Sequence, residues 1–421
     1  MENKKQYQVL KQGIWAVFMR GIGALGILVL TIVWNRMMPA KEAGLYFLAA
    51  TYLQLIYMLS PLGLDTAALK IIPLEIGKRK KSFLKSALLI SVLGSAVITL
   101  FAFLFLKFYC TFTDYHFLNI FWLYIPMAIA LTMNRILSNA LFAKKQVVWG
   151  TFLQSGLVSW MTIFLFLCFS IKFGSSFTEA ATAAFFASIA AAIVGIYLLR
   201  KDIFGADYIP NKCQLIRFGL PFLTIALLNL LLDATDKFML PIFDSVNSVA
   251  PYEAARQSVR IGELFLVSCN TVVAPRFAKY WNCREKEKAV QLLKTSSIIL
   301  FILSLGLLAG FIFFGRFLMH LNNAAYTEMY PVLLILAIGQ TFVLGTGAVS
   351  YFLMMTGKER TYRNCIIGCV ITNILLNMIM IPKFGIIGAA TATTISLTGK
   401  NVATFILAMY SVRQIKFGEQ A

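Results

Sequence analysis

Two arginines, Arg256 and Arg260, stand four residues apart in a stretch that is otherwise apolar enough to cross a membrane. Residues at this spacing share one face of a helix, and Glu253 and Glu263 extend that face. A charge at the bilayer centre costs roughly 2.5–3.5 kcal/mol on insertion scales, so such residues usually face water or the bundle interior. Planar guanidinium groups bind phosphate well because each donates two hydrogen bonds. This face predicts a cationic path for an anionic cargo.

A second polar face lies just upstream. Asp233, Asp236 and Lys237 are separated by three and four residues, which aligns them on one side of a helix. Two successive helices therefore each carry a polar stripe. The simplest arrangement has the two stripes facing each other or a shared cavity.

Other ionisable residues also fall within predicted membrane spans. The cationic ones are candidates for contact with the cargo: Arg256, Arg260, Lys400, Arg20, Arg135 and Lys237. The acidic ones are candidates for coupling transport to an ion: Asp233, Asp236, Glu253, Glu263 and Asp65. No spacing selects one of these acids as the ion site.

The alternative interpretation of these charges is mutual neutralisation. It predicts plain ion pairs, such as Asp233 with Lys237 and Glu263 with Arg260. It explains the neighbouring arginines poorly, because like charges four residues apart on a helix repel. Both interpretations stay open at the level of the sequence.

The composition requires a membrane protein. Of the 421 residues, 59% are hydrophobic and 13% charged, and the mean hydropathy is +0.77. A helix needs about 20 apolar residues to cross the bilayer. We predict twelve such spans, near residues 13–34, 42–64, 84–106, 117–141, 149–171, 177–199, 217–241, 249–275, 293–315, 326–353, 362–381 and 386–411.

The net charge of +20 is explained by topology rather than by nucleic-acid binding. Cytoplasmic loops of membrane proteins are enriched in Lys and Arg. With a cytoplasmic N-terminus, 25 of the 38 Lys and Arg residues lie in inside segments and only six lie outside. We therefore expect both termini in the cytoplasm and no nucleic-acid partner.

Neither a metal nor a cofactor is expected. The seven cysteines are scattered without metal-ligand spacing. The sequence also lacks a Gly-rich phosphate loop ending in Lys-Ser or Lys-Thr, so ATP hydrolysis on this chain is not expected to drive transport.

The chain divides into two faintly similar halves, 1–205 and 206–421. At an offset of 206 residues Gly13 matches Gly219 and Tyr46 matches Tyr252. Six spans per half give both halves the same orientation, and substrate sites in such repeats lie between the halves near the midplane. We expect two six-helix lobes.

Several stretches resemble the O-antigen repeat-unit flippases, in the polysaccharide branch of the multidrug/oligosaccharidyl-lipid/polysaccharide exporter superfamily. The stretches are Pro39–Tyr46, Gly63–Ala67, Phe218–Phe222, Asp233–Leu240 and Ile381–Ala390. Their order and spacing extend the resemblance over nearly the whole chain.

This resemblance implies an all-α polytopic membrane protein, with two six-helix lobes around a central cationic cavity and an alternating-access cycle. The implied cargo is an oligosaccharide repeat unit on undecaprenyl pyrophosphate, moved to the periplasmic leaflet of the bacterial inner membrane. Membrane lipids, a polysaccharide polymerase and a chain-length regulator are the implied partners.

Three other functions are weighed against this one. A multidrug exporter of the same superfamily carries cationic drugs, so an acidic cavity with few buried arginines is expected of it. A lipid II flippase typically has two more helices than the twelve predicted here. A membrane O-antigen polymerase or glycosyltransferase usually has a long outward loop, whereas no outward segment here exceeds about 15 residues.

Overall fold

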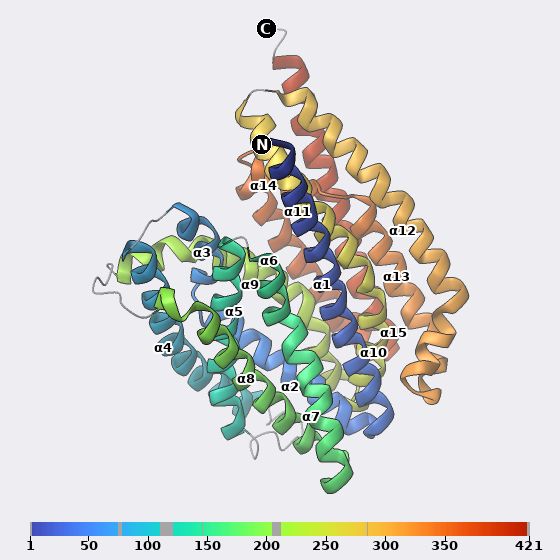
Figure 1. Ribbon diagram of the computed structural model, residues 1–421. Helices are drawn as coiled ribbons and strands as arrows, with labels where there is room; N and C mark the ends of the chain where they lie inside the picture. The colour runs from blue at the N-terminus through green and yellow to red at the C-terminus, as the bar shows by residue number, and fades with distance from the viewer. Residues whose placement is uncertain are drawn as a thin grey trace. The chain divides into compact units, whose positions relative to one another are not determined.

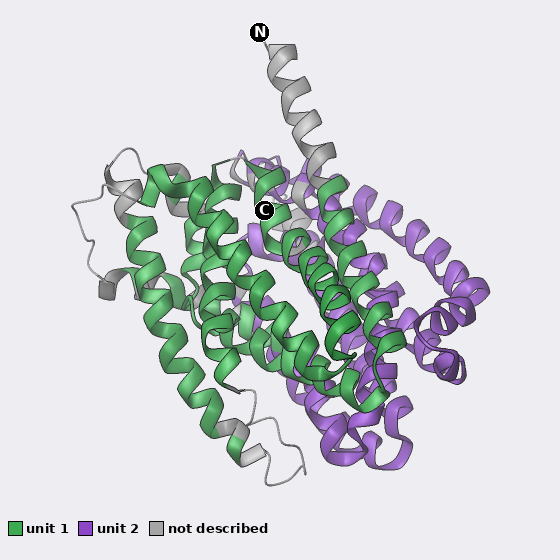
Figure 2. Ribbon diagram, turned by 60° about the horizontal axis from the view of Figure 1, so that its bottom comes forward, with its two compact units in different colours: residues 1–230 green, residues 231–421 purple. Residues whose placement is uncertain are grey.

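The computed structural model describes residues 2–74, 78–109, 121–144, 146–203, 212–283 and 285–418. Within these ranges all regular secondary structure is helical (Figure 1). The chain forms two compact units, residues 1–230 and 231–421, which Figure 2 shows in different colours. The unit boundary falls inside helix α9 (Lys212–Phe243). The division into six-helix lobes at residues 205/206 stays a prediction.

The described residues of unit 1 form eight α-helical segments and one π-helical segment before α9. They are α1 (Glu2–Met37), α2 (Ala40–Leu59), α3 (Leu64–Leu74), α4 (Lys78–Tyr109), α5 (Phe121–Ala143), α6 (Val147–Thr151), η2 (Phe152–Gly156), α7 (Leu157–Phe173) and α8 (Phe177–Ile203). Helix α8 packs against α5 and α7. It does so with fully buried alanines, including Ala180, Ala187 and Ala191. Small side chains let membrane helices approach closely.

The turn between α2 and α3 depends on glycine. Gly63 has φ +79°, a conformation that side chains disfavour. A Cβ atom on Gly63 would lie 2.1 Å from the carbonyl oxygen of Gly219 in α9. The two backbones therefore touch, and this contact fixes the start of α3, where Asp65 lies.

Unit 2 begins within α9, and its described residues continue through eight further helical segments. They are η3 (Val246–Ser248), α10 (Val249–Val259), α11 (Ile261–Asn282), α12 (Lys286–Asn322), η4 (Ala324–Met329), α13 (Tyr330–Gly345), α14 (Val349–Met355) and α15 (Glu359–Gly418). Every residue of α10 is buried.

One predicted span is discontinuous in the structure, and the break predicted between two others is present. The predicted span 249–275 is broken at Arg260, where Glu263 bonds back to the Arg260 carbonyl and tightens the chain into a turn between α10 and α11. Helix α15 covers both predicted spans 362–381 and 386–411. It is interrupted at Gly385, whose φ is +54°, three residues after Pro382.

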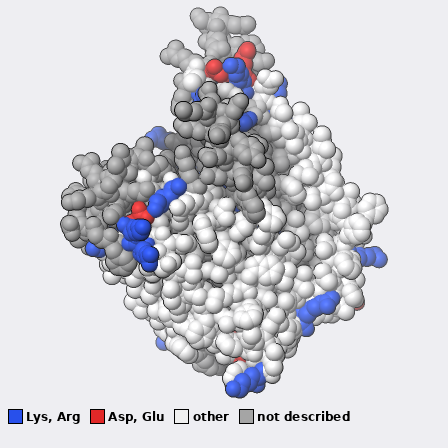
Figure 3. All heavy atoms as spheres, viewed as in Figure 1, with Lys and Arg blue, Asp and Glu red and all other residues white. Residues whose placement is uncertain are grey.

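Nine described helical stretches are long and apolar enough to cross a membrane. The predicted spans 217–241 and 249–275 are not among these described stretches. Helix α12 exposes Ile298, Ile302, Phe313 and Phe317, which suits contact with lipid. On the face in Figure 3, Lys and Arg lie mainly toward the edges of a wide uncharged area. The all-α multi-pass membrane fold is confirmed, and the count of twelve spans stays a prediction.

Candidate functional site

Eight of the eleven predicted site residues belong to unit 2, and three belong to unit 1. The eight are Asp233, Asp236, Lys237, Glu253, Arg256, Arg260, Glu263 and Lys400. The three are Arg20, Arg135 and Asp65. Within unit 2 the polar faces of α9 and α10 meet, as their spacing in the sequence predicts.

The Asp233 carboxylate lies between Arg256 and Arg260 and pairs with both. The Arg256 guanidinium forms an ion pair with the Asp233 carboxylate through Nη2 and donates from Nη1 to the Asp233 backbone carbonyl at 2.6 Å. Arg260 Nη1 lies 3.8 Å from the other carboxylate oxygen of Asp233. A carboxylate between the arginines relieves the repulsion expected of two cations one helical turn apart.

Arg260 has a second acidic partner, and Lys237 is also paired. Arg260 Nε lies 3.3 Å from Glu263, on the first turn of α11. Lys237 Nζ lies 3.1 Å from Glu253, and both side chains are buried. The Arg260–Glu263 pair agrees with the neutralisation hypothesis. That hypothesis paired Asp233 with Lys237, whereas the structure pairs Asp233 with the arginines.

Asp236 is the most enclosed acid of the cluster, with no exposed surface. Its carboxylate accepts hydrogen bonds from Tyr252 at 2.5 Å, Thr393 at 2.6 Å and Asn377 at 2.9 Å. Three neutral donors from α10 and α15 thus hold this carboxylate. No described Lys or Arg side chain lies within ion-pair distance of the Asp236 carboxylate.

Two amide atoms beside Asp236 have no hydrogen-bond partner among the described residues. They are Asn377 Oδ1 and Asn373 Nδ2, although Asn377 Nδ2 donates to Asn373 Oδ1 at 3.2 Å. Buried polar atoms without partners are uncommon in native structures. Oxygen atoms of Asp236, Thr393 and the two asparagines are the kind that hold small hard cations.

Sequence reasoning missed the partners of Asp236. In the sequence Tyr252 is significant only as the match of Tyr46 between the two halves, and Thr393 belongs to no charged or polar stripe. A periodic signal did exist, because Asn373 and Asn377 are four residues apart and share a helical face.

Lys400 lies on α15 and is partly buried. The carboxylates of Glu263 and Asp233 attract its ammonium group. Lys400 therefore belongs electrostatically to the same group of charges as the two arginines.

The predicted residues of unit 1 form one ion pair. Arg135 Nε in α5 lies 2.6 Å from the Asp65 carboxylate at the start of α3, and Asp65 is nearly fully buried. Arg20 lies on α1 and is partly buried. The binding and coupling roles of all eleven residues stay predictions.

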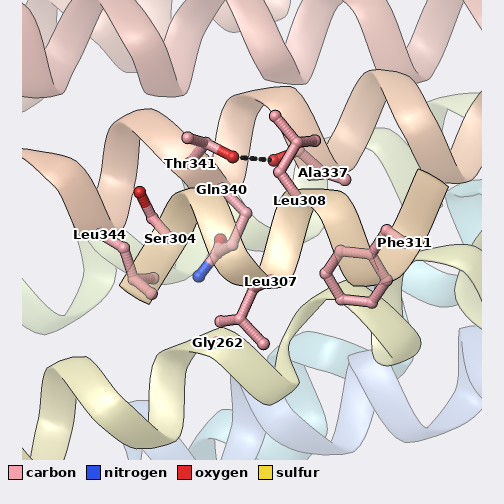
Figure 4. A pocket seen from close by; sticks show the side chains of 9 residues that line it. All are labelled: Gly262, Ser304, Leu307, Leu308, Phe311, Ala337, Gln340, Thr341 and Leu344. Atoms are coloured by element: carbon pink, nitrogen blue, oxygen red, sulfur yellow. Dashed lines mark hydrogen bonds between the residues drawn. The ribbon is translucent and has the colours of Figure 1, made fainter. Parts of the chain in front are cut away.

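A separate small pocket opens between α11, α12 and α13 (Figure 4). Its lining is mostly apolar and includes Gly262, Leu308, Phe311 and Gln340. With a cavity volume of about 10 Å³, it is far smaller than the roughly 300–1,000 Å³ typical of small-molecule sites. A lipid-linked oligosaccharide would not fit in it.

Residues 9–281 match the family model described as "Polysaccharide biosynthesis protein". The chain belongs to this polysaccharide biosynthesis family. Among curated proteins, it is 22% identical over 386 residues to the uncharacterized membrane protein MJ1068 of Methanocaldococcus jannaschii, covering 86% of this chain and 76% of that protein.

Two solved structures have the same fold as this family member. An inward-facing multidrug resistance MATE family transporter of the MOP superfamily matches with a TM-score of 0.75 at 15% identity, covering 96% of this chain and 99% of that one. The lipid II flippase MurJ, in an inward closed conformation, matches with a TM-score of 0.75 at 18% identity, covering 96% and 87%. The comparisons thus confirm a polysaccharide biosynthesis family and the fold that the resemblance implies.

Proposed function

We propose that this protein is a flippase for lipid-linked oligosaccharides. The cargo is a repeat unit of O-antigen or a related surface polysaccharide, attached to undecaprenyl pyrophosphate. It moves from the cytoplasmic to the periplasmic leaflet by alternating access. The protein performs no covalent chemistry on the cargo.

The observation that carries this proposal is the Arg256–Asp233–Arg260 group within a polysaccharide biosynthesis protein. Two guanidinium groups converge on one anion in a segment flanked by membrane helices. Their forked donors suit the pyrophosphate, which is the part of the cargo common to every sugar repeat unit. Lys400 supplies a further positive charge near this group.

We further propose that Asp236 couples transport to a proton or a small monovalent cation. Among the described residues this fully buried carboxylate has no ion-pair partner, and a buried charge without one is unfavourable. Binding of a proton or cation would neutralise it, and release would restore the charge. Tyr252, Thr393 and Asn377 keep the carboxylate in place through this exchange.

The proposed location is the bacterial inner membrane, with both termini in the cytoplasm. The basic loops at 78–85 and 276–294 would then lie on the same side as the termini. A polysaccharide polymerase and a chain-length regulator are the proposed partners, because both would act on the flipped repeat unit.

A multidrug exporter remains the second candidate, since a MATE family transporter has the same fold. A cationic drug needs acidic groups that are not already neutralised. In unit 2, Asp233, Glu253 and Glu263 each face a basic side chain. This pairing favours the anionic cargo. A membrane polymerase or glycosyltransferase is third, with no feature of the described residues in its favour.

Deletion of the gene tests the proposal. We expect undecaprenyl-pyrophosphate-linked repeat units to accumulate in the inner leaflet and surface polysaccharide to be lost. Normal surface polysaccharide together with new sensitivity to cationic drugs would support the exporter instead.

A further inference from the structure

Asp233 occupies the position between two arginines that an anionic ligand would take. Its two carboxylate oxygens face different guanidinium groups, one on Arg256 and the other on Arg260. A phosphate group accepts hydrogen bonds from the same donors in the same forked geometry. Asp233 and a phosphate therefore compete for the same donors.

Asp233 and Arg260 are more exposed than Arg256. The side chains of Asp233 and Arg260 are 31% and 35% exposed, whereas that of Arg256 is 8% exposed. A ligand arriving from the exposed side meets Asp233 and Arg260 first. Arg256 becomes available only when the Asp233 carboxylate swings away.

Each arginine keeps another contact when that carboxylate leaves. Arg256 Nη1 is bonded to the backbone carbonyl of Asp233, which does not depend on the side-chain rotamer. Arg260 Nε remains beside Glu263. The two guanidinium groups thus stay oriented, and the exchange requires only rotation of one short side chain.

We propose that Asp233 is a built-in anion that holds the arginine pair in the absence of cargo and is displaced by the cargo's pyrophosphate. This inference rests on the proposed function, and it adds a determinant of selectivity. A diphosphate carries more negative charge than one carboxylate and displaces Asp233, whereas a single carboxylate does not. The returning carboxylate then competes with the bound diphosphate and promotes its release.

The test measures binding of inorganic pyrophosphate to the purified full-length protein in detergent. Asp233→Asn keeps the side-chain shape but removes the competing charge. We expect it to bind pyrophosphate at least about tenfold more tightly than the wild type, as removal of a charge-assisted competitor predicts. Asp233→Glu keeps a carboxylate and should stay much closer to the wild type.

Asp202→Asn is the matched control for net charge. Asp202 pairs with Lys144 at 2.5 Å in unit 1, so the substitution removes one carboxylate from an ion pair outside this cluster. It should leave pyrophosphate affinity unchanged. An equal gain in Asp202→Asn and Asp233→Asn would show a general effect of net charge and overturn the exchange.

The remaining outcomes separate this inference from the proposed function. If Arg256→Ala abolishes binding while Asp233→Asn binds like the wild type or more weakly, the exchange is wrong and the arginine site stands. If neither substitution changes binding, the pyrophosphate site itself is wrong. Asp233→Ser is a second neutral variant, and elution as a folded monodisperse protein is checked for each. Misfolding of both neutral variants would assign Asp233 a structural role and contradict the exchange.

Discussion

At the scale of single residues, the charged side chains of unit 2 form ion pairs that differ in burial. Lys237 and Glu253 form a closed buried pair, whereas Asp233, Arg260 and Glu263 remain partly exposed. Both side chains of the buried pair are less than 10% exposed. The exposed group can exchange one anion for another, which is the property that a transport site needs.

The buried pair predicts a large loss of stability when one partner is removed. Lys237→Ala leaves Glu253 buried and unpaired, which typically costs about 3–5 kcal/mol. Thermal unfolding in detergent measures this loss. Lys144→Ala is the control, because the Lys144–Asp202 pair is more exposed and such pairs contribute about 0–1 kcal/mol. Equal effects of the two substitutions would contradict the assignment of Lys237 and Glu253 as a buried pair.

Asp236 leads to a prediction about energy coupling. Asp236→Asn keeps an oxygen acceptor for Tyr252 and Thr393 but removes the exchangeable charge. We expect transport by reconstituted vesicles to lose its response to an imposed proton or sodium gradient. Pyrophosphate binding should persist, since the arginine pair is intact. A variant that still responds to the gradient as the wild type does would assign coupling to another acid.

At the scale of helices, a contact between two glycines positions the start of α3, which carries Asp65. Gly63 combines a positive φ with a backbone contact to Gly219. The turn before Asp65 therefore cannot accept a side chain without moving α9 or α3.

Gly63→Ala is expected to destabilise the protein through both strain and collision. Gly174 also has a positive φ, +91°, but a Cβ atom there would meet nothing within 4 Å. Gly174→Ala thus isolates backbone strain, typically of order 1–3 kcal/mol. Gly63→Ala should lower the unfolding temperature further than Gly174→Ala. A similar shift for both would mean that the Gly63–Gly219 contact contributes little.

The sequence predicted the polar faces of single helices better than the side-chain contacts between helices. Spacings of three and four residues placed Asp233, Asp236 and Lys237 on one face correctly. Periodicity does not determine how one helix is rotated against the next, so the pairing of Asp233 with Arg256 was not predicted. The Asp236 contacts with Asn377 and Thr393 join residues 141 and 157 positions apart. No local pattern encodes contacts at that separation.

At the scale of the whole molecule, the distribution of basic loops predicts the topology. Reporter fusions at Lys81, Lys286 and the C-terminus should read inside, because these segments belong to the basic clusters. Fusions near Asp114, which lies outside the described residues, and Ala324 should read outside. An outside signal at Lys286 would contradict the twelve-span arrangement.

The central claim is that Arg256 and Arg260 bind the pyrophosphate of a lipid-linked oligosaccharide during its translocation. The most direct measurement is translocation of such a lipid across vesicles that contain the purified protein, compared with Arg260→Ala and Arg260→Ala/Glu263→Ala. We expect both variants to lose at least about tenfold in rate while remaining folded, because loss of a charge-assisted hydrogen bond typically costs about 1.5–3 kcal/mol. Restoration of the wild-type rate in the double variant would instead show that Arg260 only neutralises Glu263, and would contradict the claim.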